Sequence, residues 1–516
     1  MKYKWIFLFL FLTLLPLLSL RDYTVGNELR YLSIADEAMR EGTFFAFTNH
    51  GVFYADKPPL YFWIIMLGKW LFGEHYMWFI SLFSFIPAGI ITCIMDRWCA
   101  KELADSYRTT GVLMMMSCGL FLALILILRM DMLMCMFITL ALYIFYRMLK
   151  SEGNKQVNAV LFPLFIFLAL FTKGPIGFLV PLLSTFVFLL LTKRFRTIGK
   201  YWGWKTWTIL LLCCAGWFGA AYAEGGQEYM HNMLFHQTID RAVNSFRHDG
   251  PFYHYCLTIW YAMLPWSFLL ASVLIISALK KPKYTELQKF FLTIIGTTFV
   301  LLSSISSKVD VYMLPMFPFI VYLALMFLPE VSRNRWVMLS LVLPASIFVL
   351  AFPAYMVVSR METMAFAIQP LFYVAAGLLS LTGILALYIL YKKEQTLLAI
   401  RTLVYGLFVA AFIGSWDIPK INGEIGYREL CTKAKELARI HQTSDYYVWK
   451  LRRPENMDVY LQQDIIITTP EAVAQSGDRQ ALFLVPAKEL SHIPDYFAEK
   501  ETYQIGRRYA IIVLKD

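Results

Sequence analysis

Long apolar segments separated by short polar ones run through most of the chain. A helix that crosses a bilayer needs about 20 apolar residues. Counting an apolar segment at residues 6–20, the pattern predicts about thirteen transmembrane helices. The others are residues 76–96, 109–128, 131–149, 157–172, 175–192, 206–223, 256–279, 288–305, 309–328, 336–358, 369–391 and 397–415. The predicted fold class is therefore an α-helical polytopic membrane protein.

Two shorter helices are predicted between the first and second spans. Residues 28–40 carry an apolar stripe typical of an amphipathic helix. Residues 59–72 are apolar, but Lys69 interrupts them and they are too short to span comfortably. We expect this second helix to lie at the membrane interface.

Composition supports the membrane assignment, because 59% of the 516 residues are hydrophobic and only 16% are charged. The mean hydropathy is +0.56, whereas a soluble domain is about half apolar and a quarter charged. The net charge of +11 could suggest nucleic-acid binding. However, Lys and Arg cluster between the apolar segments, as in cytoplasmic loops. The eight cysteines show no metal-ligand spacing.

Loop charges predict the orientation. Lys2 and Lys4 precede the first apolar segment and no small-residue cleavage site follows it, which indicates an uncleaved helix with a cytoplasmic N-terminus. Basic residues then recur in alternate loops. We therefore expect a bacterial inner-membrane protein in which the first long loop (residues 21–75), loop 224–255 and the C-terminus are periplasmic.

The composition changes after residue 416, which predicts a transmembrane domain at 1–416 and a small periplasmic α/β domain at 417–516. In this tail we expect a helix at 427–440 and short helical pieces at 471–475 and 488–491. Strands are expected at 446–449, 465–468, 481–485 and 509–514. The tail carries no catalytic signature. It could cover a site or hold an acceptor, and structural support is an equally good interpretation.

Charged motifs gather in the first periplasmic loop. Asn27-Glu28-Leu29-Arg30-Tyr31 opens the amphipathic helix, and Tyr54-Ala55-Asp56-Lys57-Pro58-Pro59 precedes the interfacial one. The two prolines stiffen the backbone and bias Lys57 away from helical geometry. An acid and a base are thus held side by side at the edge of the membrane.

Short turns on the same predicted side carry further ionisable groups. These are Asp131, Lys173, Lys308 and the neighbouring Tyr312. Charges at membrane depth are costly, so each is a functional candidate. Asp131 could instead pair with Arg129 or cap a helix, and Lys173 could extend its amine to the interface.

The loop 224–255 is also rich in polar groups, which are His231, His236, Arg241, Arg247, His248 and Asp249. Arginine forks suit a phosphate, although a solvated loop in contact with lipid headgroups explains these residues equally well. A sugar carried on a polyprenyl phosphate would have its reactive bond at this depth. Cations could stabilise the leaving phosphate, and a carboxylate could orient or deprotonate an acceptor or hold a divalent metal. The sequence contains no P-loop and no G-x-G-x-x-G motif, which disfavours a nucleotide-driven reaction.

The chain resembles the membrane glycosyltransferases of the GT-C type, the superfamily of protein O-mannosyltransferases and bacterial lipid A aminoarabinose transferases. The matching motifs are the two quoted above, the Lys-Gly-Pro turn at 173–175 and a Lys-x-x-x-Tyr-x-Leu-Pro turn at 308–315. The resemblance covers residues 1–415. It implies a GT-C fold, a polyprenyl-phosphate-sugar donor, a periplasmic site and inversion at the anomeric carbon.

Roles for individual residues follow from this resemblance. The predicted catalytic residues are Glu28, Asp56 and Asp131. The predicted donor-phosphate ligands are Arg30, Lys57, Lys173, Arg241 and Lys308, and the pocket residues are Asn27, Tyr31, Tyr54 and Tyr312. No cofactor is required, but in the aminoarabinose branch the acid matched by Asp56 can hold a metal together with a loop histidine, for which His236 is the best match.

One position departs from the family motif. Asn27 replaces its first acid, and an amide cannot act as a base. A phosphate acceptor, as on lipid A, is already ionised and needs no base, so the substitution leans toward such an acceptor over a hydroxyl on protein or glycan. The alternatives are a flippase for the same lipid, and a membrane protein whose tail binds envelope partners. The identity of the sugar and the oligomeric state stay open.

Overall fold

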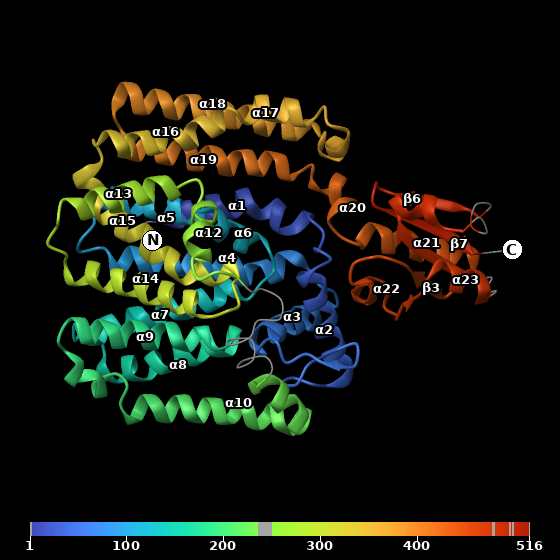
Figure 1. The fold of residues 1–516 in the computed structure, drawn as a ribbon, viewed down its shortest axis with the longest axis horizontal. Helices are drawn as coiled ribbons and strands as arrows, with labels where there is room; N and C mark the ends of the chain where they lie inside the picture. The colour runs from blue at the N-terminus through green and yellow to red at the C-terminus, as the bar shows by residue number, and fades with distance from the viewer. Residues whose placement is uncertain (1–2, 236–249, 477–479, 495–496, 498–499, 515–516) are drawn as a thin grey trace.

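The computed structural model describes residues 3–235, 250–476, 480–494, 497 and 500–514. Helices run side by side in a bundle, and a small sheet domain lies at one end of it (Figure 1). Helices α2 and α3 lie at that same end. This arrangement brings the two charged motifs and the C-terminal domain together.

Eight apolar helical segments of the described chain are long enough to cross a membrane. They are α4 (Met77–Trp98), α7 (Asp131–Leu149), α8 (Lys155–Lys173), α10 (Trp204–His231), α14 (Glu286–Ser304), η3 (Asp310–Met316) with α15 (Phe317–Val331), α18 (Pro370–Lys393) and α19 (Thr396–Ser415). Three bent pairs raise the number to eleven. The remaining two predicted spans correspond to α1 (Lys4–Leu20) and α9 (Ile176–Leu191), which are shorter. The polytopic helical fold is confirmed, and the count of thirteen stays a prediction.

Each bent pair corresponds to one predicted span. They are α5 (Asp105–Met116) with α6 (Gly119–Leu126), bent by 60°; α12 (His254–Ala262) with α13 (Ser267–Leu279), bent by 118°; and α16 (Arg335–Val349) with α17 (Ala351–Val358), bent by 41°. The first two breaks meet. The Gly119 amide donates to the Leu264 carbonyl at 2.6 Å, and the Trp266 indole donates to Ser117 Oγ at 3.0 Å. A backbone amide at the first break thus pairs with a backbone carbonyl at the second, and a side-chain hydrogen bond links the two breaks again.

The backbones approach closely where these breaks meet, which favours glycine at position 119. A Cβ built on Gly119 would lie 3.0 Å from the Leu264 carbonyl oxygen and 3.4 Å from that of Ala262. The chain also differs from the prediction at 224–255, because helical structure continues to His231, with a kink at Gly226. Glu224, on this extra turn, accepts hydrogen bonds from the amides of residues 44–46 at 2.6–3.0 Å.

The two predicted helices of the first loop are present as α2 (Asn27–Glu41) and α3 (Leu60–Phe72), with a hairpin of β1 (Thr48–Asn49) and β2 (Val52–Phe53) between them. Asp36 of α2 contacts Lys69 of α3 and His75, both at 2.7 Å. Lys69, which interrupts the apolar segment, therefore links the two helices through an ion pair.

The C-terminal domain contains a five-stranded sheet in the order β4-β3-β5-β7-β6. Strand β3 (Asp445–Val448) runs parallel to β4 (Ile466–Ile467) and β5 (Ala481–Pro486), while β7 (Tyr509–Leu514) is antiparallel to β5 and β6 (Thr502–Ile505). The predicted helix at 427–440 corresponds to α21 (Arg428–His441), and four strands were foreseen. The sequence of the edge strand β6, Thr-Tyr-Gln-Ile, alternates polar and apolar residues, but four residues are too few for this alternation to stand out, and β6 was missed. The other short elements are η1 (Phe195–Lys200), η4 (Glu362–Ala367), η5 (Ile418–Ile421), α20 (Asn422–Ile425), η6 (Pro454–Met457), α22 (Asp458–Leu461), α23 (Pro470–Ser476) and η7 (Ala487–His492).

Buried polar contacts fasten this domain to the start of the first loop. The carboxylate of Asp22 accepts from the Arg428 amide at 2.9 Å and from the Tyr460 hydroxyl at 2.5 Å. Asp458 accepts from Ser33 of α2 at 2.9 Å. Hydrogen bonds to buried charged groups are among the stronger ones, so the domain is fixed against α2.

Candidate functional site

The second residue of the first motif is a buried carboxylate. Glu28 is 1% exposed, and its two oxygens contact Arg21 at 2.5 and 2.7 Å. They also accept from the amides of Thr24 and Leu128 at 2.8 and 2.6 Å. Glu28 therefore ties the start of α2 to the turn that leads into Asp131.

Asn27 and Arg30 act as a unit. The amide oxygen of Asn27 accepts from Nη2 of Arg30 at 3.0 Å. The guanidinium lies 5.1 Å from the ring centre of Tyr54 and 5.8 Å from that of Tyr31, within the range of a cation–π contact. The residue that departs from the family motif thus orients a candidate phosphate ligand.

The second motif presents its charges next to that unit. Lys57 Nζ lies 2.9 Å from Oδ2 of Asp56, and the Tyr54 hydroxyl donates to the same oxygen at 3.2 Å. Both charged side chains keep some exposure, 13% for Lys57 and 15% for Asp56. Burial, followed by the charges of Tyr31 and Asp56, raises the pKa of Tyr54, so its hydroxyl stays protonated. Lys57 is thus a partly exposed cation held in a rigid loop.

Asp131 sits in a buried cluster at the ends of α7 and α8. It is ion-paired with Lys173 and contacts Arg129 Nε at 3.0 Å, while its own side chain is 0% exposed. Lys173 Nζ also lies 4.5 Å from the ring centre of Tyr312. The salt bridge to Arg129 that the sequence suggested is therefore present, together with a second one.

Tyr31 lies close enough to both the Asp56 loop and the Asp131 cluster for charges of each to shift its pKa. Burial raises its pKa, the charges of Arg129 and Arg30 lower it, and those of Asp131 and Asp56 raise it. The structure thus gathers most of the predicted residues at one end of the bundle. They are Asn27, Glu28, Arg30, Tyr31, Tyr54, Asp56, Lys57, Asp131, Lys173 and Tyr312.

Lys308 is placed differently. Its ammonium donates to the carbonyls of Leu302 at 3.1 Å and Ser303 at 2.7 Å, and also to that of Ile305. These carbonyls belong to the end of α14, where a cation satisfies the unpaired acceptors. The contacts hold Lys308 at that helix end, with Tyr255 as its aromatic neighbour at 5.8 Å.

Two predicted residues, His236 and Arg241, lie outside the described residues. In the described ranges no group of three or more His, Cys, Asp or Glu side chains could hold a metal ion. Of the two proposed metal ligands only Asp56 is described, and its carboxylate is paired with Lys57.

One neighbour of this site comes from a distant part of the chain. Arg453, in the C-terminal domain, donates to the carbonyl of Gly26 at 3.4 Å across a sequence separation of 427 residues. No local pattern encodes a contact between segments so far apart.

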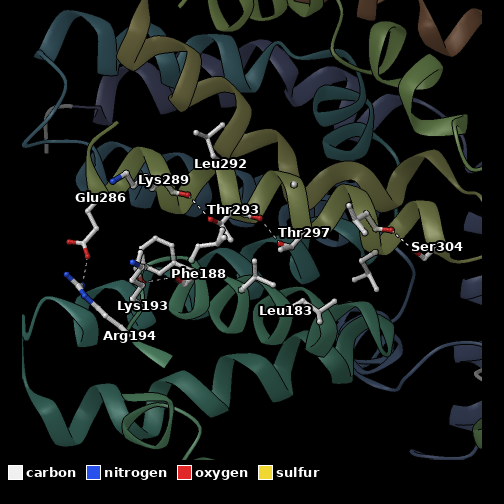
Figure 2. A pocket seen from close by; sticks show the side chains of 16 residues that line it. Leu183, Phe188, Lys193, Arg194, Glu286, Lys289, Leu292, Thr293, Thr297 and Ser304 are labelled. Atoms are coloured by element: carbon white, nitrogen blue, oxygen red, sulfur yellow. Dashed lines mark hydrogen bonds and ion pairs between the residues drawn. The ribbon is translucent and has the colours of Figure 1, made fainter. Parts of the chain in front are cut away.

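A cavity of about 1180 Å³ lies elsewhere, between α9 and α14 (Figure 2). Its lining is mainly apolar, and its charged groups gather at one end, where Arg194 pairs with Glu286. That end is formed by the end of α9 and the start of α14, away from Lys173 and Lys308. The cavity contains none of the predicted site residues.

This chain is similar to a known protein family, to known sequences and to solved structures. Residues 56–218 match the family described as dolichyl-phosphate-mannose-protein mannosyltransferase. An uncharacterised protein of Aquifex aeolicus is 26% identical over 89% of this chain and 88% of its own. The undecaprenyl phosphate-alpha-4-amino-4-deoxy-L-arabinose arabinosyl transferases of Shewanella sediminis and Proteus mirabilis are 27% and 25% identical over 61% of this chain, and the match spans 58% of each of them.

Solved structures show the same fold. The crystal structure of ArnT from Cupriavidus metallidurans bound to undecaprenyl phosphate superposes with a TM-score of 0.76 at 16% identity, over 99% of this chain and 98% of that one. The apo structure gives 0.73 at 17% identity. The resemblance to the GT-C superfamily of aminoarabinose and protein mannosyl transferases, and the fold expected from it, are confirmed.

Proposed function

We propose that this chain, a GT-C membrane protein that resembles the aminoarabinose and protein mannosyl transferases, transfers a sugar from a polyprenyl phosphate donor to an acceptor in the cell envelope. The site would be the cluster at the end of the bundle that carries α2 and α3. We further propose that this end faces the periplasm of a bacterial inner membrane, with the N-terminus in the cytoplasm.

The observation that carries the proposal is the pair of cations at Arg30 and Lys57. Arg30 is stacked on Tyr54 and oriented by Asn27, and Lys57 is partly exposed in a loop stiffened by prolines. Cations fixed in advance at the place where negative charge develops are an efficient way to stabilise a leaving group.

The proposed reaction is a single displacement. An oxygen of the acceptor forms a bond to the anomeric carbon, and the bond from that carbon to the donor phosphate oxygen breaks. The electron pair leaves with polyprenyl phosphate, whose added negative charge Lys57 and Arg30 would stabilise. Attack from the face opposite the leaving group inverts the anomeric carbon. Tyr31, Tyr54 and Tyr312 would line the sugar pocket.

Ion pairing of the acids supports an acceptor that is already ionised. Glu28 is paired with Arg21, Asp56 with Lys57, and Asp131 with both Lys173 and Arg129. A neighbouring cation holds a carboxylate in its charged form and makes it a weaker proton acceptor. A phosphate of the lipid A type needs no base, whereas a hydroxyl does. Asp131 and Asp56 would then orient cations and acceptor.

The proposal is tested with purified protein in liposomes that contain a radiolabelled polyprenyl phosphate sugar and lipid A. Wild-type protein should label lipid A, and Lys57→Ala should lower transfer by about a hundredfold, the scale of one transition-state ligand. Lys101→Ala is a matched control, since Lys101 is 86% exposed and pairs only with Glu152 among its described contacts. Equal transfer by wild type and Lys57→Ala would refute the site. Movement of intact donor lipid across the bilayer without transfer would indicate a flippase.

A further inference from the structure

We propose that Arg453 of the C-terminal domain belongs to the phosphate site, where its guanidinium and that of Arg30 together bind the phosphate of a lipid substrate. The C-terminal domain would then complete the site. The inference rests on the proposed function and deepens it, because the tail carries no catalytic signature of its own.

The first support is position. Arg453 Nη1 donates to the carbonyl of Gly26 at 3.4 Å. Gly26 immediately precedes Asn27, whose amide oxygen holds Arg30 at 3.0 Å. Two guanidinium groups from remote parts of the chain therefore converge on the first turn of α2, beside Tyr54.

The second support is uncompensated charge. Neither Arg30 nor Arg453 forms an ion pair with a carboxylate of the described residues, and Nε of Arg30 is buried without a hydrogen-bond partner there. Burial lowers the pKa of Arg453, and the charges of Arg30 and Arg452 lower it further. Two cations that repel each other and keep an unused buried donor are arranged as they would be around an anion.

The third support is backbone geometry. Arg453 adopts φ +51° and ψ +53°, a left-handed conformation that residues with a side chain rarely take, and it precedes Pro454. Such strain persists only where the surroundings fix it. The Tyr427 hydroxyl holds the preceding carbonyl, that of Arg452, at 2.8 Å, and Asp458 anchors the segment to Ser33 of α2. Arg453 is thus held in place relative to Arg30.

The ligand chemistry is a phosphate ester. Planar guanidinium forks match the oxygens of a phosphate and bind it in a bidentate manner. Two sources carry such a group in the proposed reaction, namely the polyprenyl phosphate of the donor and the phosphate of a lipid A-type acceptor. Separate measurements of the two substrates distinguish them.

The test uses full-length protein with Arg453→Gln and Arg453→Lys. Arg452→Gln is the matched control, since Arg452 is the exposed neighbouring residue and its described contact to Tyr427 is through the backbone. KM is measured separately for donor and acceptor, with direct binding of undecaprenyl phosphate as a readout independent of turnover. The thermal unfolding temperature of each variant reports folding.

Arg453→Gln should raise one KM by about tenfold or more, the scale of one lost charge-assisted hydrogen bond. Arg453→Lys should lie between that variant and wild type, because it keeps the charge and loses the fork. A change in donor KM and in undecaprenyl phosphate binding assigns the donor phosphate, and a change in acceptor KM alone assigns the acceptor. If Arg453→Gln does not fold, Arg453→Lys alone must show the rise.

KM values and undecaprenyl phosphate binding that match Arg452→Gln in both Arg453 variants would overturn the inference. The proposed function would survive that result if Lys57→Ala still lowered transfer by about a hundredfold. Failure of wild-type transfer would instead count against the proposed function itself.

Discussion

Asp131 and Lys173 form a buried ion pair in which only Asp131 has a second oppositely charged partner among the described contacts. This difference predicts how each substitution behaves. The two side chains are 0% and 3% exposed. Asp131 also contacts Arg129, whereas Lys173 has no second carboxylate among its described contacts. Asp131→Asn therefore leaves Lys173 as a buried cation without a counter-charge. Removing one partner of a buried pair costs about 3–5 kcal/mol, and we expect Asp131→Asn to fall in that range.

Lys173→Met should cost less, because Asp131 keeps Arg129. In the double variant Asp131→Asn/Lys173→Met the stranded lysine charge is gone, so most of the stability lost by Asp131→Asn should return. Transfer should stay low in all three variants, since the pair lies beside Tyr312 in the proposed site. Unfolding followed in mixed micelles gives the stabilities, and liposome transfer gives the activities.

Two results would refute this reasoning. The first is Lys173→Met being more destabilising than Asp131→Asn, which would mean that Arg129 does not compensate Asp131. The second is a double variant that is as unstable as the sum of the single changes, which would mean that the two groups do not interact.

Three further predictions concern the framework around the site. Glu28→Gln should lower the free energy of unfolding by on the order of 3 kcal/mol, because it breaks charged hydrogen bonds to Arg21. The KM of the folded protein should not change, and a large increase in KM would argue for a direct role of Glu28 in binding. Gly119→Ala should destabilise the folded protein by about 1–3 kcal/mol, because the added Cβ would lie close to the carbonyl of Leu264. Gly296→Ala should not destabilise it, because a Cβ at that position has no atom within 4 Å. Equal unfolding temperatures for the two variants would contradict this reasoning. Burial raises the pKa of Asp458, so protonation of this carboxyl stabilises the folded protein, and that stabilisation is lost as the pH rises through the folded pKa. Asp458→Asn should therefore unfold at a higher temperature than wild type at pH 7, and the two unfolding temperatures should converge below about pH 4. A difference in unfolding temperature that does not depend on pH would contradict the raised pKa.

Much of the architecture follows from local pattern. Apolar length located the spans, and an apolar stripe located α2. Breaks within spans could not be read in this way, because Ser117 and Gly119 are ordinary residues in a membrane helix. Their role depends on Leu264 and Trp266, which are far along the chain.

The candidate site likewise has residues that local sequence pattern reveals and contacts that it does not. Lys57 and Asp131 could be singled out as candidates because a charge beside an apolar segment is costly. The sequence could not tell that Lys308 contacts the carbonyls of α14, nor that Arg453 reaches Gly26. Those contacts depend on tertiary packing, and no periodicity records them.

The proposed reaction breaks the bond between the anomeric carbon and the phosphate oxygen, and a doubly labelled donor tests that point directly. A polyprenyl phosphate sugar carrying tritium in the sugar and phosphorus-32 in the phosphate is incubated with the reconstituted protein and lipid A. We predict that tritium moves to lipid A while phosphorus-32 stays with the polyprenyl lipid, and that Lys57→Ala lowers the tritium transfer by about a hundredfold. Both labels reaching lipid A, or both staying on the donor lipid, would contradict glycosyl transfer.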